Sequence, residues 1–85
     1  MPAMKVKVYG ADWCGDTKRA LKFLDGLGVA YDYINVEQDA EASRWVKEHN
    51  DGKELKPTID VAGQILSVPD EHELTQALRE KELMA

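Results

Sequence analysis

The sequence is poor in the groups that most often cross-link a small fold or bind a metal. Its 85 residues include one cysteine and two histidines. A single cysteine rules out a disulfide within the chain, so we expect side-chain packing alone to hold the fold. His49 and His72 have no partner at the spacing of metal ligands, and we predict no metal site.

The sequence also lacks long apolar runs and any concentration of positive charge. No stretch is long enough to cross a membrane, and residues 1–5 contain no apolar signal core. The chain has 11 Lys and Arg against 16 Asp and Glu, a net charge of −5, and its basic residues are scattered. Nucleic-acid binding needs a positive surface. We therefore expect a cytoplasmic protein with no membrane and no nucleic-acid partner, and we take it to be a monomer.

What is present is the composition of an ordinary globular protein, with 44% hydrophobic and 32% charged residues. A chain of this length forms one domain, which we place at residues 1–85 with its core at about residues 5–81.

The first half of the chain predicts a strand, a helix and a second strand. Residues 5–9 alternate polar and apolar side chains and end at Gly10, which is typical of a strand. A helix is indicated next by apolar side chains at helical spacing, closed by Gly28, although Asp25 and Gly26 weaken its last turn. Residues 29–36 are rich in β-branched and aromatic side chains and predict a strand parallel to the first.

The second half predicts a helix, a hairpin and a last helix. Asp39 is a plausible cap for a helix that ends at residues 50–52, and Trp45 lies on its apolar face. Strands at residues 58–61 and 64–67 flank a two-residue turn. Asp70 and Glu73 have the spacing of a capping box. The order βαβ-α-ββα predicts an α/β fold with helices on both faces of the sheet.

Cys14 is the residue with the clearest chemical potential. It follows the first strand and begins the first helix, where unpaired amides and the helix dipole favour a thiolate. We expect the amides of Gly15 and Asp16 to stabilise it, together with the Thr17 hydroxyl. The carboxylates of Asp12 and Asp16 oppose ionisation. The alternative is a buried cysteine that acts only as a small hydrophobic residue.

Two separated motifs resemble the active-site loops of the thioredoxin and glutaredoxin family. Residues 13–17, Trp-Cys-Gly-Asp-Thr, resemble its Trp-Cys-x-x-Cys loop. Residues 56–58, Lys-Pro-Thr, resemble the loop whose cis-proline faces the active cysteine. Residues 31–37 and 50–52 are similar to the short glutaredoxin-like branch that includes the mycoredoxins. The resemblance covers about residues 5–81 and implies a thioredoxin fold, with a four-stranded mixed sheet flanked by three helices.

The chain departs from that pattern where Thr17 replaces the second cysteine. The resemblance therefore implies a monothiol thiol–disulfide oxidoreductase that reduces mixed disulfides between proteins and a low-molecular-weight thiol. Glutathione, mycothiol or bacillithiol would be the co-substrate, with no bound cofactor. Two alternatives stay open: a binding module without turnover, and a dimeric glutathione-dependent iron–sulfur carrier.

The resemblance also implies roles for individual residues. Cys14 is the nucleophile, with Thr17 as its stabiliser. Trp13 would shield one side of the thiol, while Lys56 and Pro57 would shape the substrate groove. Lys56 is expected to supply the positive charge for a carboxylate of the small thiol. Asp70 either binds the amine of a γ-glutamyl group or only caps its helix.

Overall fold

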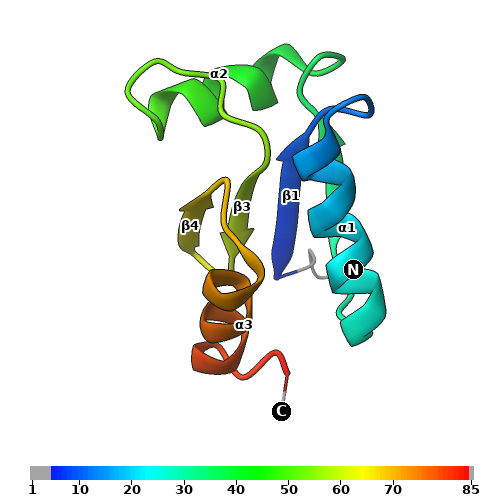
Figure 1. Cartoon of the computed structure of the whole chain (residues 1–85). Coiled ribbons are helices and arrows are strands. Elements are labelled where there is room, and N and C mark those ends of the chain that lie inside the picture. Colours follow the sequence, from blue (N-terminus) through cyan, green and yellow to red (C-terminus); the bar gives the residue numbers. More distant parts are fainter. Residues whose placement is uncertain (1–4, 85) are drawn as a thin grey trace.

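The structure, a computed structural model, describes residues 5–84. Seven elements follow one another in the predicted order (Figure 1): β1 (Val6–Gly10), α1 (Gly15–Leu27), β2 (Asp32–Asn35), α2 (Ala40–Glu48), β3 (Thr58–Val61), β4 (Gln64–Ser67) and α3 (Glu71–Glu80). Within this part of the chain no helix is long and apolar enough to cross a membrane. The prediction that residues 1–5 contain no apolar signal core falls mostly on residues 1–4, which lie outside the described residues.

The four strands form one mixed sheet in the order β2-β1-β3-β4. Strand β1 pairs with β2 in parallel and with β3 antiparallel, and β4 completes an antiparallel hairpin with β3. Because β1 is central, Tyr9 pairs with Ile34 on one side and with Thr58 on the other. The carboxyl end of β1 therefore lies beside the amino end of β3, which follows the Lys-Pro-Thr loop.

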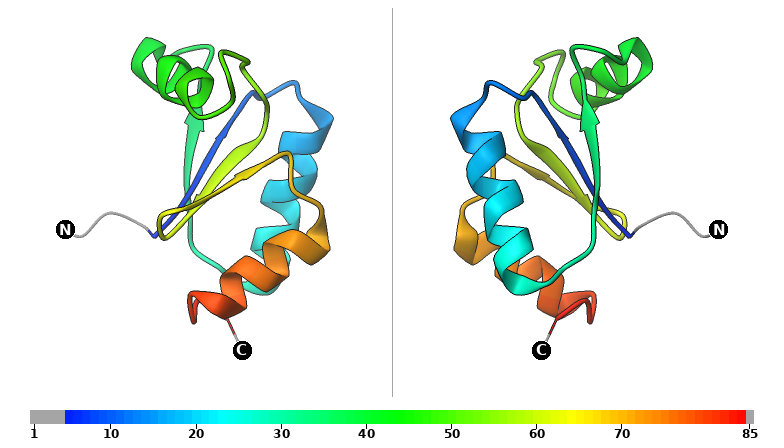
Figure 2. Two further views of the ribbon diagram at one scale, coloured as in Figure 1. Left: turned by 90° about the vertical axis from the view of Figure 1, so that its left-hand side faces the viewer. Right: turned by 90° about the vertical axis from the view of Figure 1, so that its right-hand side faces the viewer.

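The helices cover both faces of the sheet, as predicted. Figure 2 shows α1 and α3 on one face and α2 on the opposite face, near the end where β1 finishes. A larger core lies under α1 and α3 and a smaller one under α2. Trp45, predicted to face the core, is half-buried and stacks on Tyr9 with ring centroids 4.4 Å apart. His49 lies against the Trp45 ring at 4.1 Å.

The helix caps lie where the sequence predicts them, whereas the strand that follows α1 is shorter than predicted. Gly28 closes α1 in the left-handed conformation at φ 70°, and Asp39 and Asp70 cap α2 and α3. Despite Asp25 and Gly26, α1 continues to Leu27. The predicted strand at residues 29–36 is shorter, because the Val29 amide donates to Leu24 at the end of α1 and is not available to the sheet.

Gly10 brings β1 into direct contact with the first turn of α1. A Cβ atom built on Gly10 would lie 2.5 Å from the Thr17 side chain, which is closer than real contacts allow. Thr17 is itself only 1% exposed. The absence of a side chain at Gly10 therefore lets the start of α1 sit directly on the end of the central strand, and this contact fixes where Cys14 lies.

Candidate active site

Cys14 occupies the N-cap position of α1, with extended backbone angles of φ −76° and ψ 120°. Its carbonyl accepts the first helical hydrogen bond, from the Lys18 amide at 3.0 Å. The thiol is partly exposed and donates to the backbone carbonyl of Lys56, with Sγ and the oxygen 3.8 Å apart. The side chain thus lies at the surface, between the start of a helix and the proline loop.

The pKa of Cys14 lies below the ordinary value of a thiol. Burial is the largest single influence and opposes ionisation, but hydrogen bonding to the Thr17 hydroxyl and to the amides of Thr17 and Asp16 outweighs it. The negative charge of Asp16 also opposes the thiolate. Asp16 is one of the two residues whose amides were expected to stabilise the thiolate, and the amide of Thr17, at the third position of α1, also lowers the pKa.

Thr17 joins the active-site loop to α1. Its hydroxyl oxygen accepts a hydrogen bond from the Ala11 amide, at 3.4 Å, and the side chain is buried. The residue that replaces the family's second cysteine is therefore a packed part of the site, in contact with both the loop and the sulfur of Cys14.

Trp13 is 64% exposed, yet its indole is fixed by two residues from other loops. The Nε1 group donates to Glu37 Oε2 at 2.8 Å. Lys56 Nζ lies 4.9 Å from the ring centroid and 3.8 Å from Glu37 Oε2. We call Trp13, Glu37 and Lys56 the indole clamp. It gives the surface next to the thiol a fixed aromatic group, held by a cation–π contact and a hydrogen bond.

The ammonium group of Lys56 is shared between two carboxylates of the chain. Besides Glu37, it contacts Glu54 Oε1 at 3.2 Å. A hydrogen bond from Ser43, opposed by burial and assisted by Lys56, lowers the pKa of Glu54. Lys56 was expected to meet a carboxylate of the small thiol, but here its charge is already compensated within the protein.

The proline loop faces Cys14 through its backbone. The Lys56–Pro57 peptide bond is cis, and the Pro57 ring is fully buried. The Pro57 carbonyl accepts a hydrogen bond from the Val68 amide at 2.8 Å. Asp70 lies beyond that contact, where its carboxylate accepts the Glu73 amide at 2.7 Å as part of a complete capping box. The helix cap accounts for Asp70 without a ligand.

Two further residues support the site and carried no signal of this role in the sequence. The Tyr33 hydroxyl donates to Asp12 at 2.7 Å, so β2 holds the loop before Cys14. Burial, this hydrogen bond and the charges of Asp12, Glu37 and Cys14 hold the pKa of Tyr33 well above its ordinary value. Tyr33 therefore remains a donor to Asp12 throughout the neutral range.

Asn50 is the second such residue, and its buried amide joins three segments. It donates to the Val46 carbonyl at the end of α2, at 2.7 Å, and to the Thr58 hydroxyl at 3.2 Å. Its oxygen accepts the hydroxyl of Ser67, the last residue of β4. One side chain thus fixes the proline loop against α2 and against the connection to α3.

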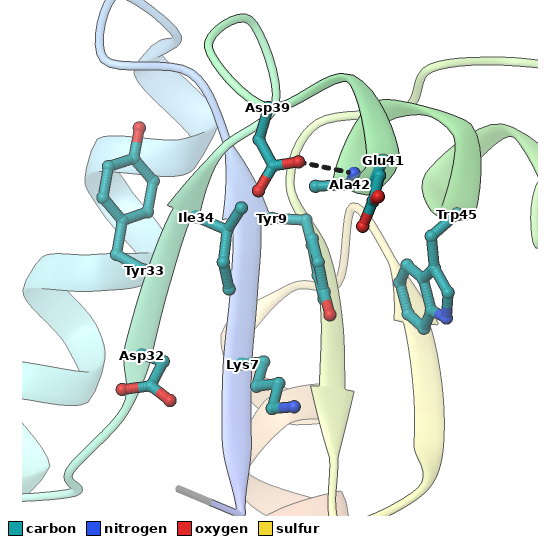
Figure 3. Close-up of a pocket in the computed structure, with 9 residues that line it drawn as sticks. All are labelled: Lys7, Tyr9, Asp32, Tyr33, Ile34, Asp39, Glu41, Ala42 and Trp45. Carbon is teal, nitrogen blue, oxygen red and sulfur yellow. Dashed lines mark hydrogen bonds between the residues drawn. The ribbon is translucent and has the colours of Figure 1, made fainter. Parts of the chain in front are cut away.

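A hollow lies away from the thiol, on the α2 side of the sheet. It measures about 510 Å³ and contains none of the predicted site residues; Figure 3 shows the Tyr9 and Trp45 rings at one side and Asp32 and Asp39 at its edge. Across residues 5–84, no three His, Cys, Asp or Glu side chains gather closely enough to hold a metal ion.

A partly exposed cysteine at a helix N-terminus, facing the carbonyl of a proline loop on a four-stranded mixed sheet, defines a thioredoxin-fold thiol site. The sequence profile of the glutaredoxin family matches residues 6–66. The chain therefore belongs to the glutaredoxin family, whose members are thiol–disulfide oxidoreductases.

Relatives with known names agree with that assignment. Mycoredoxin 1 of Corynebacterium glutamicum is 48% identical over 54 residues, which span 64% of this chain and 66% of that protein. A candidate glutaredoxin of Mycobacterium tuberculosis is 31% identical over 72 residues, spanning 84% and 86% of the two chains.

Solved structures share the fold. A single-residue variant of the thioredoxin-like protein BC3987 superposes with a TM-score of 0.80 at 27% identity, covering 88% of this chain and 95% of that one. A buckwheat glutaredoxin in complex with glutathione gives a TM-score of 0.75 at 21% identity, covering 96% and 83%.

Proposed function

We propose that the chain is a monothiol thiol–disulfide oxidoreductase that removes a low-molecular-weight thiol from protein mixed disulfides. The supporting observation is that Cys14 is the only cysteine and has a lowered pKa, while the buried Thr17 occupies the position of a resolving cysteine. The proposal takes the chain to act in the cytoplasm, as one domain and as a monomer.

The first step is an exchange at the small thiol of the substrate. The Cys14 thiolate attacks that sulfur, a new disulfide forms between Cys14 and the small thiol, and the bond to the client protein breaks. The client cysteine leaves as a thiolate and takes a proton from water. No net oxidation occurs in this step, because one disulfide replaces another.

The second step needs another small thiol, because the chain holds no further cysteine. Its thiolate attacks the small-thiol half of the adduct and releases Cys14 as a thiolate. The product is the disulfide of the small thiol. One free small thiol is thereby oxidised for each client cysteine that is reduced, and it leaves as a disulfide with the small thiol that the client carried.

The charges around the site favour a small thiol without carboxylates. Lys56 is paired with Glu37 and Glu54, and Asp12 and Asp16 lie on the loop that carries Cys14. Glutathione and bacillithiol carry carboxylates, whereas mycothiol does not. The similarity to Mycoredoxin 1 supports the same choice, so mycothiol is the proposed co-substrate.

The test is turnover of a peptide mixed disulfide with mycothiol, compared with the matching glutathione and bacillithiol peptides. We expect release of free peptide that depends on the added thiol, fastest with mycothiol, and none with Cys14→Ser. Mass spectrometry should show a Cys14 adduct before the second thiol is added. Peptide binding without release for any thiol would contradict the proposal and favour a binding module.

A further inference from the structure

The face of the sheet beneath α2 is only partly covered. Along β1, Val6 and Val8 are buried in the core under α1 and α3, whereas Lys7 and Tyr9, on the opposite face, are half-buried. Helix α2 has nine residues and lies near the end where β1 finishes (Figure 2). The hollow of about 510 Å³ described above opens on this face, and we call it the sheet-face hollow.

The floor of the sheet-face hollow is apolar and aromatic. Tyr9 and Ile34 are paired in the register of β1 and β2, and the Trp45 ring stacks on Tyr9 at an angle of 23°. Figure 3 shows Tyr9 and Ile34 between the start of α2 at one end and Lys7 and Asp32 at the other. An aromatic ring fixed by its neighbour is a preorganised surface for a cation.

The rim of the hollow carries an excess of negative charge. Asp32, Asp39 and Glu41 line it and are exposed. Of the described residues that line it, Lys7 alone is basic, and the register places Lys7 between Asp32 and Asp60. Within residues 5–84, neither Asp32 nor Glu41 forms an ion pair. Unpaired carboxylates beside an aromatic floor complement a cation.

The chemistry of the hollow favours an arginine that belongs to a protein. A guanidinium is planar, stacks on rings and bonds to carboxylates through paired N–H groups, whereas an ammonium group is compact and strongly hydrated. Because the rim carboxylates are exposed, the hollow is too open to enclose most of the surface of a small ligand. A protein covers such a hollow from outside, and a basic protein is attracted by the net charge of −5.

An occupant of the hollow leaves the thiol accessible. The groups that contact or stabilise Cys14 are the Lys56 carbonyl, the Thr17 hydroxyl and the amides of Asp16 and Thr17. None of these residues lines the hollow. A protein bound there therefore stays in place while exchange proceeds at the sulfur.

We propose that the sheet-face hollow docks a partner protein through one arginine, whose guanidinium lies against Tyr9 and pairs with the rim carboxylates. The inference goes beyond the proposed function, because this docking involves no chemistry at Cys14. It gives the chain an attachment surface that is separate from its thiol.

The test is an NMR titration of the whole chain with a short acetylated peptide that carries Arg at its centre. Matched peptides carry Lys or the neutral isostere citrulline at the same position. We expect saturable shifts of the Tyr9, Ile34 and Trp45 signals with the Arg peptide. Its affinity should exceed that of the citrulline peptide about tenfold, the combined effect of a cation–π contact and an exposed ion pair. The Lys peptide should bind less tightly than the Arg peptide, and added salt should weaken both.

The double variant Asp32→Asn with Glu41→Gln should reduce affinity for the Arg peptide to that for the citrulline peptide. The control is Glu71→Gln with Glu80→Gln, which changes the net charge equally at exposed positions of α3, on the other face of the sheet. It should leave the affinity near that of the parent. The alkylation rate of Cys14 should be the same with and without saturating Arg peptide.

Equal binding of the Arg and citrulline peptides, or an equal loss of affinity in both double variants, would overturn the inference. Free N-acetylarginine amide that binds as tightly as the peptide would also overturn it and assign the hollow to a small cation. These measurements need no turnover, so they are independent of the test of exchange. A chain that exchanges mycothiol but does not discriminate between the peptides would keep its proposed function and lose only this docking site.

Discussion

At the scale of single residues, Thr17 connects the loop, the helix and the thiol. Its hydroxyl accepts the Ala11 amide and stabilises the Cys14 thiolate, and its methyl group lies against Gly10. A residue that replaces a resolving cysteine need not have any effect on the remaining thiol. Here it contributes to the low pKa of the remaining cysteine, so loss of the second thiol does not leave the first unsupported.

Thr17→Val should therefore raise the pKa of Cys14, because the isosteric side chain cannot hydrogen-bond to the thiolate. Alkylation by iodoacetamide, followed against pH, should show its midpoint moved to higher pH. The variant should also lose about 1–3 kcal/mol of stability, since the buried Ala11 amide loses its acceptor.

Thr17→Ser is the matched control, because it retains the hydroxyl, and its midpoint should stay near that of the parent. The effect of ionisation on stability has a definite sign. A Cys14 pKa below its unfolded value adds stability at pH above the unfolded pKa, and this gain is lost as pH falls through the folded pKa. An unchanged midpoint in Thr17→Val would contradict the assigned role.

At the scale of elements, the site is assembled by three loops that meet at one end of the sheet. The loop after β1 supplies Trp13, the loop after β2 supplies Glu37, and the loop before β3 supplies Lys56. The indole clamp crosses all three. Its Trp13–Glu37 hydrogen bond is exposed and therefore adds little to global stability, and its effect is local order beside the thiol.

Glu37→Leu should release Trp13 without unfolding the protein. Stability should change by less than about 1 kcal/mol, the usual limit for an exposed pair. Acrylamide should then quench Trp13 fluorescence more strongly, measured in a Trp45→Phe background so that one indole reports. Glu37→Gln retains an oxygen acceptor for Nε1 and should stay near the parent. Equal quenching in all three proteins would show that the clamp does not hold the indole.

Asn50→Ala should be the more damaging change among the supporting residues. It removes the donors to the Val46 carbonyl and the Thr58 hydroxyl and the acceptor of the Ser67 hydroxyl, which should cost about 1–3 kcal/mol. The measurement is the midpoint of urea unfolding at unchanged slope. Lys53→Ala, at an exposed position nearby, should stay within about 0.5 kcal/mol of the parent. A similarly small loss in Asn50→Ala would mean that the network is dispensable.

At the scale of the whole molecule, one substitution should change the type of redox cycle. Thr17→Cys places a second sulfur at the third position of α1, the spacing at which the family forms its active-site disulfide. Mild oxidation should then give a monomer with no free thiol. The parent should instead give a dimer linked through Cys14 or an adduct with a small thiol.

The control combines Thr17→Cys with Cys14→Ser, which should retain one free thiol after the same treatment. If the single variant also kept both thiols free, the distance between positions 14 and 17 would be unsuitable for a bond. The family spacing would then not apply to this chain.

The order of the elements, the caps at Gly28, Asp39 and Asp70, and the position of Cys14 could all be predicted because local sequence signals determine them. Features that depend on distant partners could not. Glu37 meets Trp13 across 24 positions, and Asn50 meets Ser67 across 17. Neither contact could be recognised from residue types and spacing along the sequence. The pairing of Lys56 with Glu37 and Glu54 could not be predicted for the same reason, since the three side chains come together only in the fold.

One proton on Cys14 governs two properties at once. While the thiol is protonated, it occupies the carbonyl of Lys56. When that proton leaves, the sulfur turns from donor to acceptor and the Lys56 oxygen loses its partner. The same proton loss therefore activates the Cys14 sulfur as a nucleophile and frees the Lys56 carbonyl to accept another hydrogen bond. The backbone of a substrate can therefore donate a hydrogen bond to the Lys56 carbonyl when Cys14 is a thiolate. The site binds a substrate backbone best in the same state in which its sulfur can attack.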